Sequence, residues 1–133
     1  MRKSKINISG FKIGTAENRE GLTGVTVILA PDGGATAGVD VRGCAPGTRE
    51  TDLLDPRKTV QKIHAVVLSG GSAFGLEAAS GCVKYLAEQG VGFPIGNVCV
   101  PIVCSAVLFD LMIGDEKAYP DLLMGYEAAK SAS

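Results

Sequence analysis

The 133-residue sequence has no tryptophan, a single histidine and no marked excess of charge of either sign. It carries 13 lysine and arginine residues against 14 aspartate and glutamate residues, for a formal net charge of -1. Proteins that bind nucleic acid through its phosphates usually carry a basic surface, so this balance argues against a nucleic-acid partner. An apolar content of 46% argues against a disordered chain. We therefore expect one folded domain over residues 1–133.

Long apolar runs are also missing from the sequence. No stretch approaches the roughly 20 residues that a helix needs to cross a bilayer. The basic start over residues 1–6 (MRKSKI) is not followed by the apolar segment of a secretory signal peptide. We therefore expect a cytoplasmic protein with no membrane partner.

The cysteines lack the spacing of a metal site. The residues at positions 44, 82, 99 and 104 form no C-x-x-C pair, and the lone histidine cannot complete a zinc site with them. We interpret all four as small buried hydrophobic residues rather than metal ligands or disulfide partners. No metal and no other cofactor is expected.

What the sequence does contain is a buried strand that runs directly into a helix. Over residues 65–79 (AVVLSGGSAFGLEAA) an apolar run breaks at two serines and two glycines and then resumes with helical spacing. We call residues 69–75 the glycine turn. Its three glycines, at positions 70, 71 and 75, indicate close approach of the backbone either to a ligand or to another element of the fold.

The remaining pattern predicts a mixed α/β (α+β) domain. Runs of apolar and β-branched residues predict strands at 24–30, 35–41, 63–68, 98–103 and 106–111, and alternation over 6–14 indicates a short strand or an extended arm. The first two strands flank a turn at 31–34 and are expected to form a hairpin. One helix is expected from Ser72 onward, with Gly90 just past its end, and a final helix is expected with Pro120 in its first turn. The 18 glycines, nearly twice an average content of ~7%, indicate layers with closely approaching backbones.

Two kinds of site that use a strand, a turn and a helix fail on spacing. A dinucleotide fingerprint requires glycine at its third position, where this turn has Ser72, and a phosphate loop requires a lysine that is absent. A serine-nucleophile elbow requires glycine at the position of Phe74. Its base would have to be His64, which lies about 17 Å from the turn if the intervening strand is extended. We interpret His64 as a structural residue at a strand end.

Charged residues near the loop at 43–48 form the other candidate site. Arg42, Arg49 and Glu50 flank this loop and could meet a carboxylate or an amine of a substrate, although a surface ion pair is the simpler interpretation. The carboxylates Asp55 and Asp115 lie in turns, where a solvated capping role explains them. The residues by themselves give no complete catalytic set.

Four separated blocks resemble the L-aminopeptidase/D-esterase (DmpA-like) family. The blocks are residues 41–54 (VRGCAPGTRETDLL), 64–78 (HAVVLSGGSAFGLEA), 100–110 (VPIVCSAVLFD) and 120–133 (PDLLMGYEAAKSAS). The resemblance implies a self-processing hydrolase with an αββα sandwich fold, of which this chain resembles the N-terminal portion of the α region. It also implies that helices pack outside a mixed sheet.

The resemblance further implies where the chemistry lies. The family precursor cuts itself before a Ser or Thr, which becomes an N-terminal nucleophile with its own amine as base. That residue lies beyond the segment present here, so no catalytic residue is expected in this chain. Its expected partners are a downstream β segment or chain, a peptide, amino-acid amide or ester substrate, and further α/β units in a homo-oligomer. The pair Gly96-Asn97 resembles the family's cleavage site, but Val98 follows and carries no nucleophile.

The substrate pocket is expected at the glycine turn, with backbone N–H groups of Gly70, Gly71 and Ser72 directed at the substrate. Phe74 lies where some family members have a tyrosine whose hydroxyl helps to hold the reacting carbonyl, and phenylalanine lacks that donor. The expected substrate-binding residues are Gly70, Gly71, Ser72, Phe74, Arg49 and Glu50. The alternative hypothesis is a non-catalytic module that binds a small molecule or nucleotide at the same turn.

Overall fold

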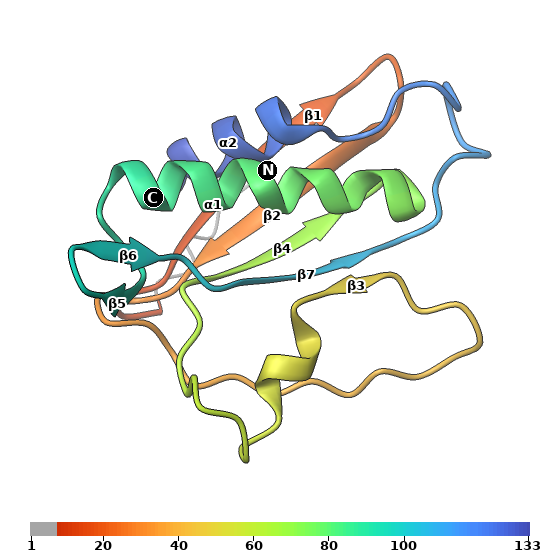
Figure 1. Ribbon diagram of the computed structural model, residues 1–133. Coiled ribbons are helices and arrows are strands. Elements are labelled where there is room, and N and C mark those ends of the chain that lie inside the picture. Colours follow the sequence, from red (N-terminus) through yellow and green to blue (C-terminus); the bar gives the residue numbers. More distant parts are fainter. Residues whose placement is uncertain (1–7) are drawn as a thin grey trace.

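The computed structural model describes residues 8–133, which fold around one five-stranded mixed sheet (Figure 1). Its strands lie in the order β1 (Lys12–Asn18), β2 (Thr23–Leu29), β4 (Ala65–Ser69), β7 (Val103–Val107) and β3 (Thr48–Arg49). Only the β4–β7 pair is parallel. The mixed α/β class expected from the sequence is confirmed, and the start of the extended segment expected at residue 6 lies outside the described residues.

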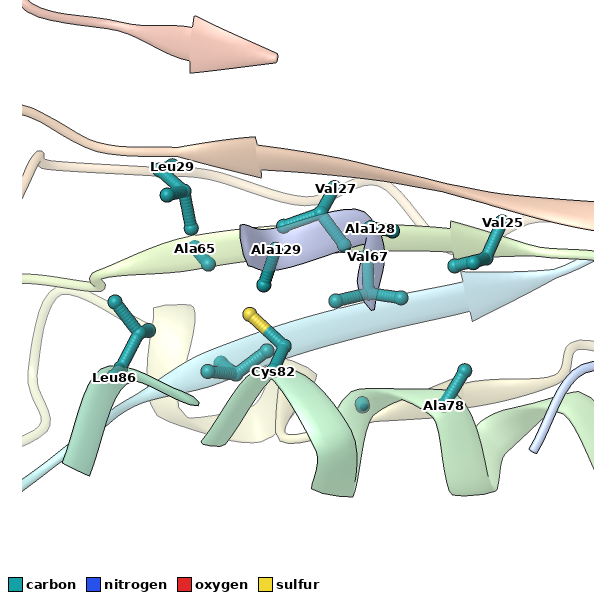
Figure 2. Packing of buried hydrophobic residues seen from close by; sticks show 12 residues of the cluster. Val25, Val27, Leu29, Ala65, Val67, Ala78, Cys82, Leu86, Ala128 and Ala129 are labelled. Carbon is teal, nitrogen blue, oxygen red and sulfur yellow. The ribbon is translucent and has the colours of Figure 1, made fainter. Parts of the chain in front are cut away.

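Two helices pack on one face of the sheet. Figure 1 shows α1 (Ala78–Glu88) and α2 (Leu122–Lys130) side by side over the strands. Strand β2 alternates buried and half-buried residues, as expected for a strand that turns one face to a helical layer. The core between the layers consists of Val25, Val27, Leu29, Ala65, Val67, Ala78, Ala79, Cys82, Leu86, Val103, Ala128 and Ala129 (Figure 2).

The opposite face of the sheet carries a second row of apolar side chains. Ile13 lies opposite Ile28, and Ile28 lies opposite Val66, while Leu68 on the same face is 46% exposed. We call these four residues the open face. Ile13 and Leu68 are exposed, whereas Ile28 and Val66 are half-buried. Exposed apolar side chains grouped on one face are typical of a surface that another segment covers.

The expected hairpin between residues 24–30 and 35–41 is wrong. Strand β2 has β1 on one side and β4 on the other, so both of its edges are already paired. The consecutive glycines Gly33 and Gly34 both have positive φ and direct the chain away from β2. Beyond them, Ala35 forms only an isolated bridge to Ile63.

Strand limits near Pro101 also differ from the expected ones. Residues 98–100 form β6 (Val98–Val100), which pairs with β5 (Phe93–Ile95) in a separate hairpin, and β7 begins only at Val103. Proline has no N–H to donate to a sheet, which explains the break between the two strands. The Gly96-Asn97 pair forms the turn of this hairpin, with Gly96 at a φ of 57°.

Both helices begin later than expected. Residues Ser72–Glu77 form a 3-10 helix before α1, and Gly90 ends α1 with a φ of 68°, as a C-terminal glycine should. Helix α2 begins after Asp121, whose carboxylate accepts a hydrogen bond from the N–H of Met124 at 2.8 Å. Asp121 therefore caps the helix, because its carboxylate gives a partner to a backbone N–H group that has none within the helix.

The cysteine interpretation is correct for two of the four residues. Cys82 and Cys104 are buried. Cys44 is exposed on a loop, and Cys99 is exposed on strand β6 of the β5–β6 hairpin. Burial raises the pKa of the Cys82 thiol to about 12, so this thiol stays protonated. Among residues 8–133, no helix is long and apolar enough to span a bilayer, and no cluster of three potential metal ligands occurs.

Glycine allows the helices and the sheet to approach backbone to backbone. A Cβ atom on Gly81 would collide with the carbonyl oxygen of Leu122 in α2, and one on Gly125 would collide with that of Ala78 in α1. Gly14 in β1 meets the carbonyl of Ala128 in the same way. The close approach that the glycine content predicts is confirmed at these three contacts.

Replacing Gly125 by alanine should destabilise the fold, because the new methyl group must push α1 and α2 apart. We expect a loss of about 2 kcal/mol or more in the free energy of unfolding, measured by denaturant titration. The control is Gly38→Ala, since Gly38 has open space around the position of a Cβ atom. That variant should stay within about 0.5 kcal/mol of the parent. Equal losses in the two variants would contradict the packing argument.

Candidate functional site

The glycine turn joins the end of β4 to the 3-10 helix at Ser72. Gly71 has a φ of 80° and Ser72 a φ of 52°, so two consecutive residues lie in the left-handed region. Glycine adopts this conformation freely, whereas a serine there costs on the order of 1 kcal/mol. Such strain persists only where the surrounding contacts impose it, and it is common at functional sites.

The N–H groups of Gly70, Gly71 and Ser72 are all paired within the chain. Gly70 donates to the carbonyl of Gly24 at 2.9 Å, and Ser72 donates to the carbonyl of Leu108 at 3.0 Å. Gly71 donates to Oδ1 of Asp110 at 2.6 Å. The expectation that these three N–H groups are directed at a substrate is therefore wrong, because the neighbouring strands and loop already accept from them.

The glycines of the turn are required by neighbouring parts of the fold. A Cβ atom on Gly70 would collide with the side chains of Asp110 and Thr23, and one on Gly75 would collide with the carbonyl of Gly70. A Cβ atom on Gly71 would lie 2.6 Å from that of Tyr119. Of the two explanations for the three glycines, close approach to other parts of the chain accounts for all of them: Gly70 and Gly71 meet other elements, and Gly75 meets the turn itself.

A groove of about 570 Å³ lies next to the turn. Its walls are the end of β1, the start of β2 with the preceding Leu22, and the residues Gly70, Leu108 and Asp110. Asp110 lies at the centre of the contacts here, because its Oδ2 also accepts a hydrogen bond from the hydroxyl of Thr23 at 2.8 Å. Sequence reasoning missed both Asp110 and Thr23. The available signal was a lone carboxylate at the end of the apolar run 106–111.

Phe74 projects from the 3-10 helix and is 58% exposed. Its ring stacks on that of Tyr119, with 4.6 Å between the ring centroids and 17° between the ring planes. An exposed stacked pair offers an apolar surface to a ligand or to another segment. Its assignment to a substrate pocket stays a prediction, as does that of Gly70, Gly71 and Ser72.

Arg49 and Glu50 lie away from the glycine turn. Arg49 pairs with Ser105 across β3 and β7, and its guanidinium donates to the hydroxyl of Ser80 in α1 at 2.7 Å. The carbonyl of Glu50 accepts from the thiol of Cys104, whereas the turn contacts the other end of β7. Arg42 forms the expected exposed ion pair, with Asp40 at 2.6 Å. Strand β7 thus lies between β3, which carries Arg49, and β4, which leads into the glycine turn, and a substrate role for Arg49 and Glu50 stays a prediction.

Comparison with known proteins identifies the family. The model of peptidase family S58 matches residues 5–132, which is nearly the whole chain. The chain belongs to peptidase family S58. This match confirms the resemblance that the four sequence blocks indicate. The groove and the glycine turn therefore belong to a hydrolase scaffold.

Curated S58 relatives are considerably longer than this chain. An uncharacterized aminopeptidase of Mycobacterium leprae is 50% identical over 109 residues, which cover 82% of this chain and 30% of that protein. A 6-aminohexanoate-oligomer endohydrolase of Paenarthrobacter ureafaciens is 35% identical over 128 residues, or 96% of this chain and 33% of that protein. The S58 chain described here therefore spans about a third of the length of these relatives.

His64 has a structural role in this S58 chain, as expected. It is only 5% exposed, and its Nδ1 accepts a hydrogen bond from the N–H of Ile102 at 3.1 Å. It lies at the end of β4 opposite the glycine turn, too far to act as a base for Ser72. Burial lowers the pKa of its imidazole below the ordinary value, and protonation of Nδ1 would break the bond to Ile102.

The lowered pKa of His64 predicts a pH dependence of stability. Because the folded state binds this proton less tightly than the unfolded state, the contribution is present above the unfolded pKa of 6.5 and is lost as pH falls below it. Unfolding free energies at pH 7.5 and 5.5 should therefore differ more for the parent than for His64→Gln. A parent and a variant with the same pH dependence would contradict this assignment.

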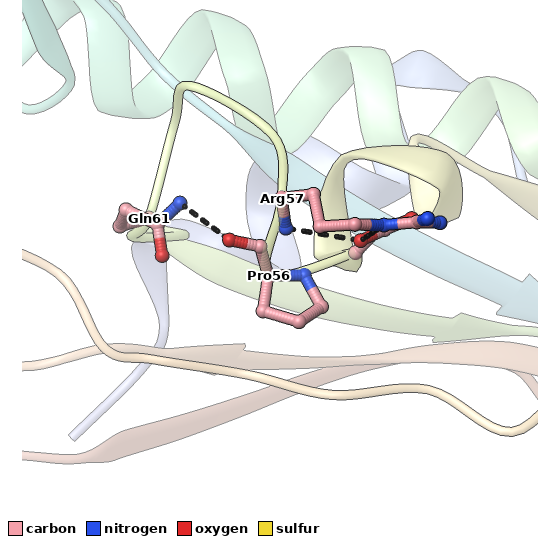
Figure 3. Close-up of polar contacts among 4 residues, drawn as sticks. Pro56, Arg57 and Gln61 are labelled. Atoms are coloured by element: carbon pink, nitrogen blue, oxygen red, sulfur yellow. Dashed lines mark hydrogen bonds and ion pairs between the residues drawn. The ribbon is translucent and has the colours of Figure 1, made fainter.

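The carboxylate of Asp55 serves the local loop structure. Figure 3 shows Arg57 folded onto this loop, where its side chain and its own N–H both donate to Asp55, and Gln61 donates to the carbonyl of Pro56. The Arg57 side chain lowers the pKa of Asp55 to about 2. A carboxylate held ionised on an exposed loop fits the capping role expected for it, and Asp115 similarly accepts from the N–H of Lys117.

Proposed function

We propose that this chain is the α-region scaffold and pocket wall of a self-processing aminopeptidase or amidase. The observation that carries the proposal is the pairing of an S58 sequence with a sheet that is covered on one face and apolar on the other. The groove beside the glycine turn lies at one end of this sheet. A downstream segment or second chain of the same precursor would cover the open face and close the groove.

In this proposal the reaction is acyl transfer from a peptide, amino-acid amide or ester. The hydroxyl of a downstream Ser or Thr attacks the carbonyl carbon, its own terminal amine takes the proton, and the leaving amine or alcohol receives a proton in turn. Water then releases the acyl group. The names of the relatives, aminopeptidase and oligomer endohydrolase, support hydrolysis of amide bonds. The chain itself supplies the wall around Gly70 and Phe74 and no attacking group.

The binding-module alternative loses its main support. A phosphate or nucleotide held by a turn of this kind needs free backbone N–H donors. Here the N–H groups of Gly70, Gly71 and Ser72 are paired with Gly24, Asp110 and Leu108. The assembly that we propose instead is an oligomer of units, each containing this chain and its downstream partner.

Expression of the chain with and without its downstream segment tests the proposal. We expect the longer polypeptide to split into two chains, detected by mass spectrometry, and to hydrolyse aminoacyl p-nitroanilides. The 133-residue chain alone should show no hydrolysis. Replacement by alanine of the Ser or Thr at the new N-terminus should abolish both cleavage and turnover. Hydrolysis by the short chain alone would show that the attacking residue lies within it and would overturn the proposal.

The open face offers a second, independent test. Leu68→Lys places a charge on that face, so it should weaken association of the chain with its separately expressed downstream partner at least tenfold. The control is Leu123→Lys, because Leu123 is exposed on α2, in the helical layer on the other side of the sheet. Binding is measured by calorimetry. Equal affinities for the parent and Leu68→Lys would mean that another surface meets the partner.

A further inference from the structure

The carboxylate of Asp110 joins three segments that are distant in the sequence. Oδ1 accepts from the N–H of Gly71 at 2.6 Å, and Oδ2 accepts from the hydroxyl of Thr23 at 2.8 Å. Thr23 opens β2, and Gly71 follows β4, so one side chain connects the glycine turn to the neighbouring strand. No other carboxylate among residues 8–133 contacts the N–H of a residue in the glycine turn.

Backbone strain lies on both sides of this bridge. Leu22, directly before Thr23, has a φ of 54°, and Ser72, directly after Gly71, has a φ of 52°. Leucine and serine rarely adopt this left-handed conformation unless surrounding contacts hold it. Two of the three non-glycine residues with positive φ in the described part of the chain are thus adjacent to the two partners of Asp110.

The loop that carries Asp110 is itself fixed to both segments. We call residues 108–115 the Asp110 loop. The N–H of Leu108 donates to the carbonyl of Ser69 and its carbonyl accepts from Ser72, both at 3.0 Å. At the other end of the loop, the N–H of Asp115 donates to the carbonyl of Gly21. Contacts at both ends of the loop therefore hold the carboxylate between the glycine turn and the segment that precedes β2.

Asp110 also lines the groove, together with Gly70 and Leu22. Its two hydrogen bonds form at the boundary between this groove and the glycine turn. A change in the turn would therefore alter the wall of the groove directly. The carboxylate and the turn are in close contact, because a Cβ atom on Gly70 would collide with the carboxylate of Asp110.

We propose that Asp110 is a positioning residue for hydrolysis, which sets the shape of the groove wall by holding the glycine turn against Thr23. The proposal rests on the proposed function, since it assigns a substrate to this groove. Asp110 acts through hydrogen-bond geometry and has no part in proton transfer. An isosteric amide should serve nearly as well, because it can accept from the N–H of Gly71 and donate to the hydroxyl of Thr23.

The experiment uses the full-length, self-processed protein and four variants. Asp110→Ala removes both hydrogen bonds, Asp110→Asn keeps their geometry without the charge, and Thr23→Val removes one bond. The control is Asp115→Ala, because Asp115 lies in the same loop and, within residues 8–133, its side chain accepts only the local N–H of Lys117. Measurements are kcat and KM for aminoacyl p-nitroanilides, the Tm, and hydrogen exchange at the N–H of Gly71.

We expect Asp110→Ala to lower kcat/KM at least 30-fold and to speed exchange at Gly71 at least tenfold. Thr23→Val should lie between this variant and the parent, and Asp110→Asn should recover to within about fivefold of the parent. Asp115→Ala should match the parent in every measurement. A residue that only stabilised the fold would change the Tm and kcat/KM together in all three site variants, without recovery by asparagine.

Several outcomes would overturn the assignment. Activity of Asp110→Ala within twofold of the parent would do so, as would equal losses in Asp110→Ala and Asp110→Asn. If Asp110→Ala fails to fold, Thr23→Val and Asp110→Asn still decide the question through kcat/KM and the exchange rate. The assignment would also be contradicted if Thr23→Val and Asp110→Asn both lost activity while the hydrogen-exchange rate at the N–H of Gly71 stayed unchanged. An inactive parent protein would instead contradict the proposed function.

Discussion

Direct backbone-to-backbone contact at glycine is the constraint on which this fold depends. Helices α1 and α2 meet where Gly81 and Gly125 each face a carbonyl of the other helix, and α2 meets β1 at Gly14. The side chains between these layers are accordingly small, with alanine at four core positions on the two helices. Close packing of this kind leaves little room for rearrangement, so the helical layer provides a rigid support for the sheet and the turn that follows β4.

The site region depends on polar contacts in addition to packing. The glycine turn is held by a strand carbonyl at Gly24, a loop carbonyl at Leu108 and the carboxylate of Asp110. These contacts satisfy every N–H group from Gly70 to Ser72, which explains how a strained conformation can persist at Ser72. The turn contributes Gly70 to the wall of the groove, and it does so through the shape of its backbone rather than through free N–H donors.

Patterns that depend on neighbouring residues could be predicted from the sequence, whereas partners distant along the chain could not. Apolar runs and the glycine content indicated β4, α1 and the close layers, because these signals reside in the segments themselves. The hairpin expected at residues 24–41 failed because β2 found both its neighbours elsewhere, in β1 and β4. The sequence did not reveal the roles of Asp110 and Thr23 either, because these two partners lie 87 residues apart along the chain. Glycine spacing suggested free N–H donors only because their acceptors lie in other segments.

The parallel pairing of β4 with β7 has a consequence for how the groove wall forms. A parallel neighbour requires a long crossover, and here that crossover contains α1 and the β5–β6 hairpin. The contacts that shape the glycine turn therefore close loops of tens of residues, which is slow relative to the formation of a helix. The turn can acquire its final conformation only after the Asp110 loop has docked. The wall of the groove is therefore expected to be among the last parts of the fold to form.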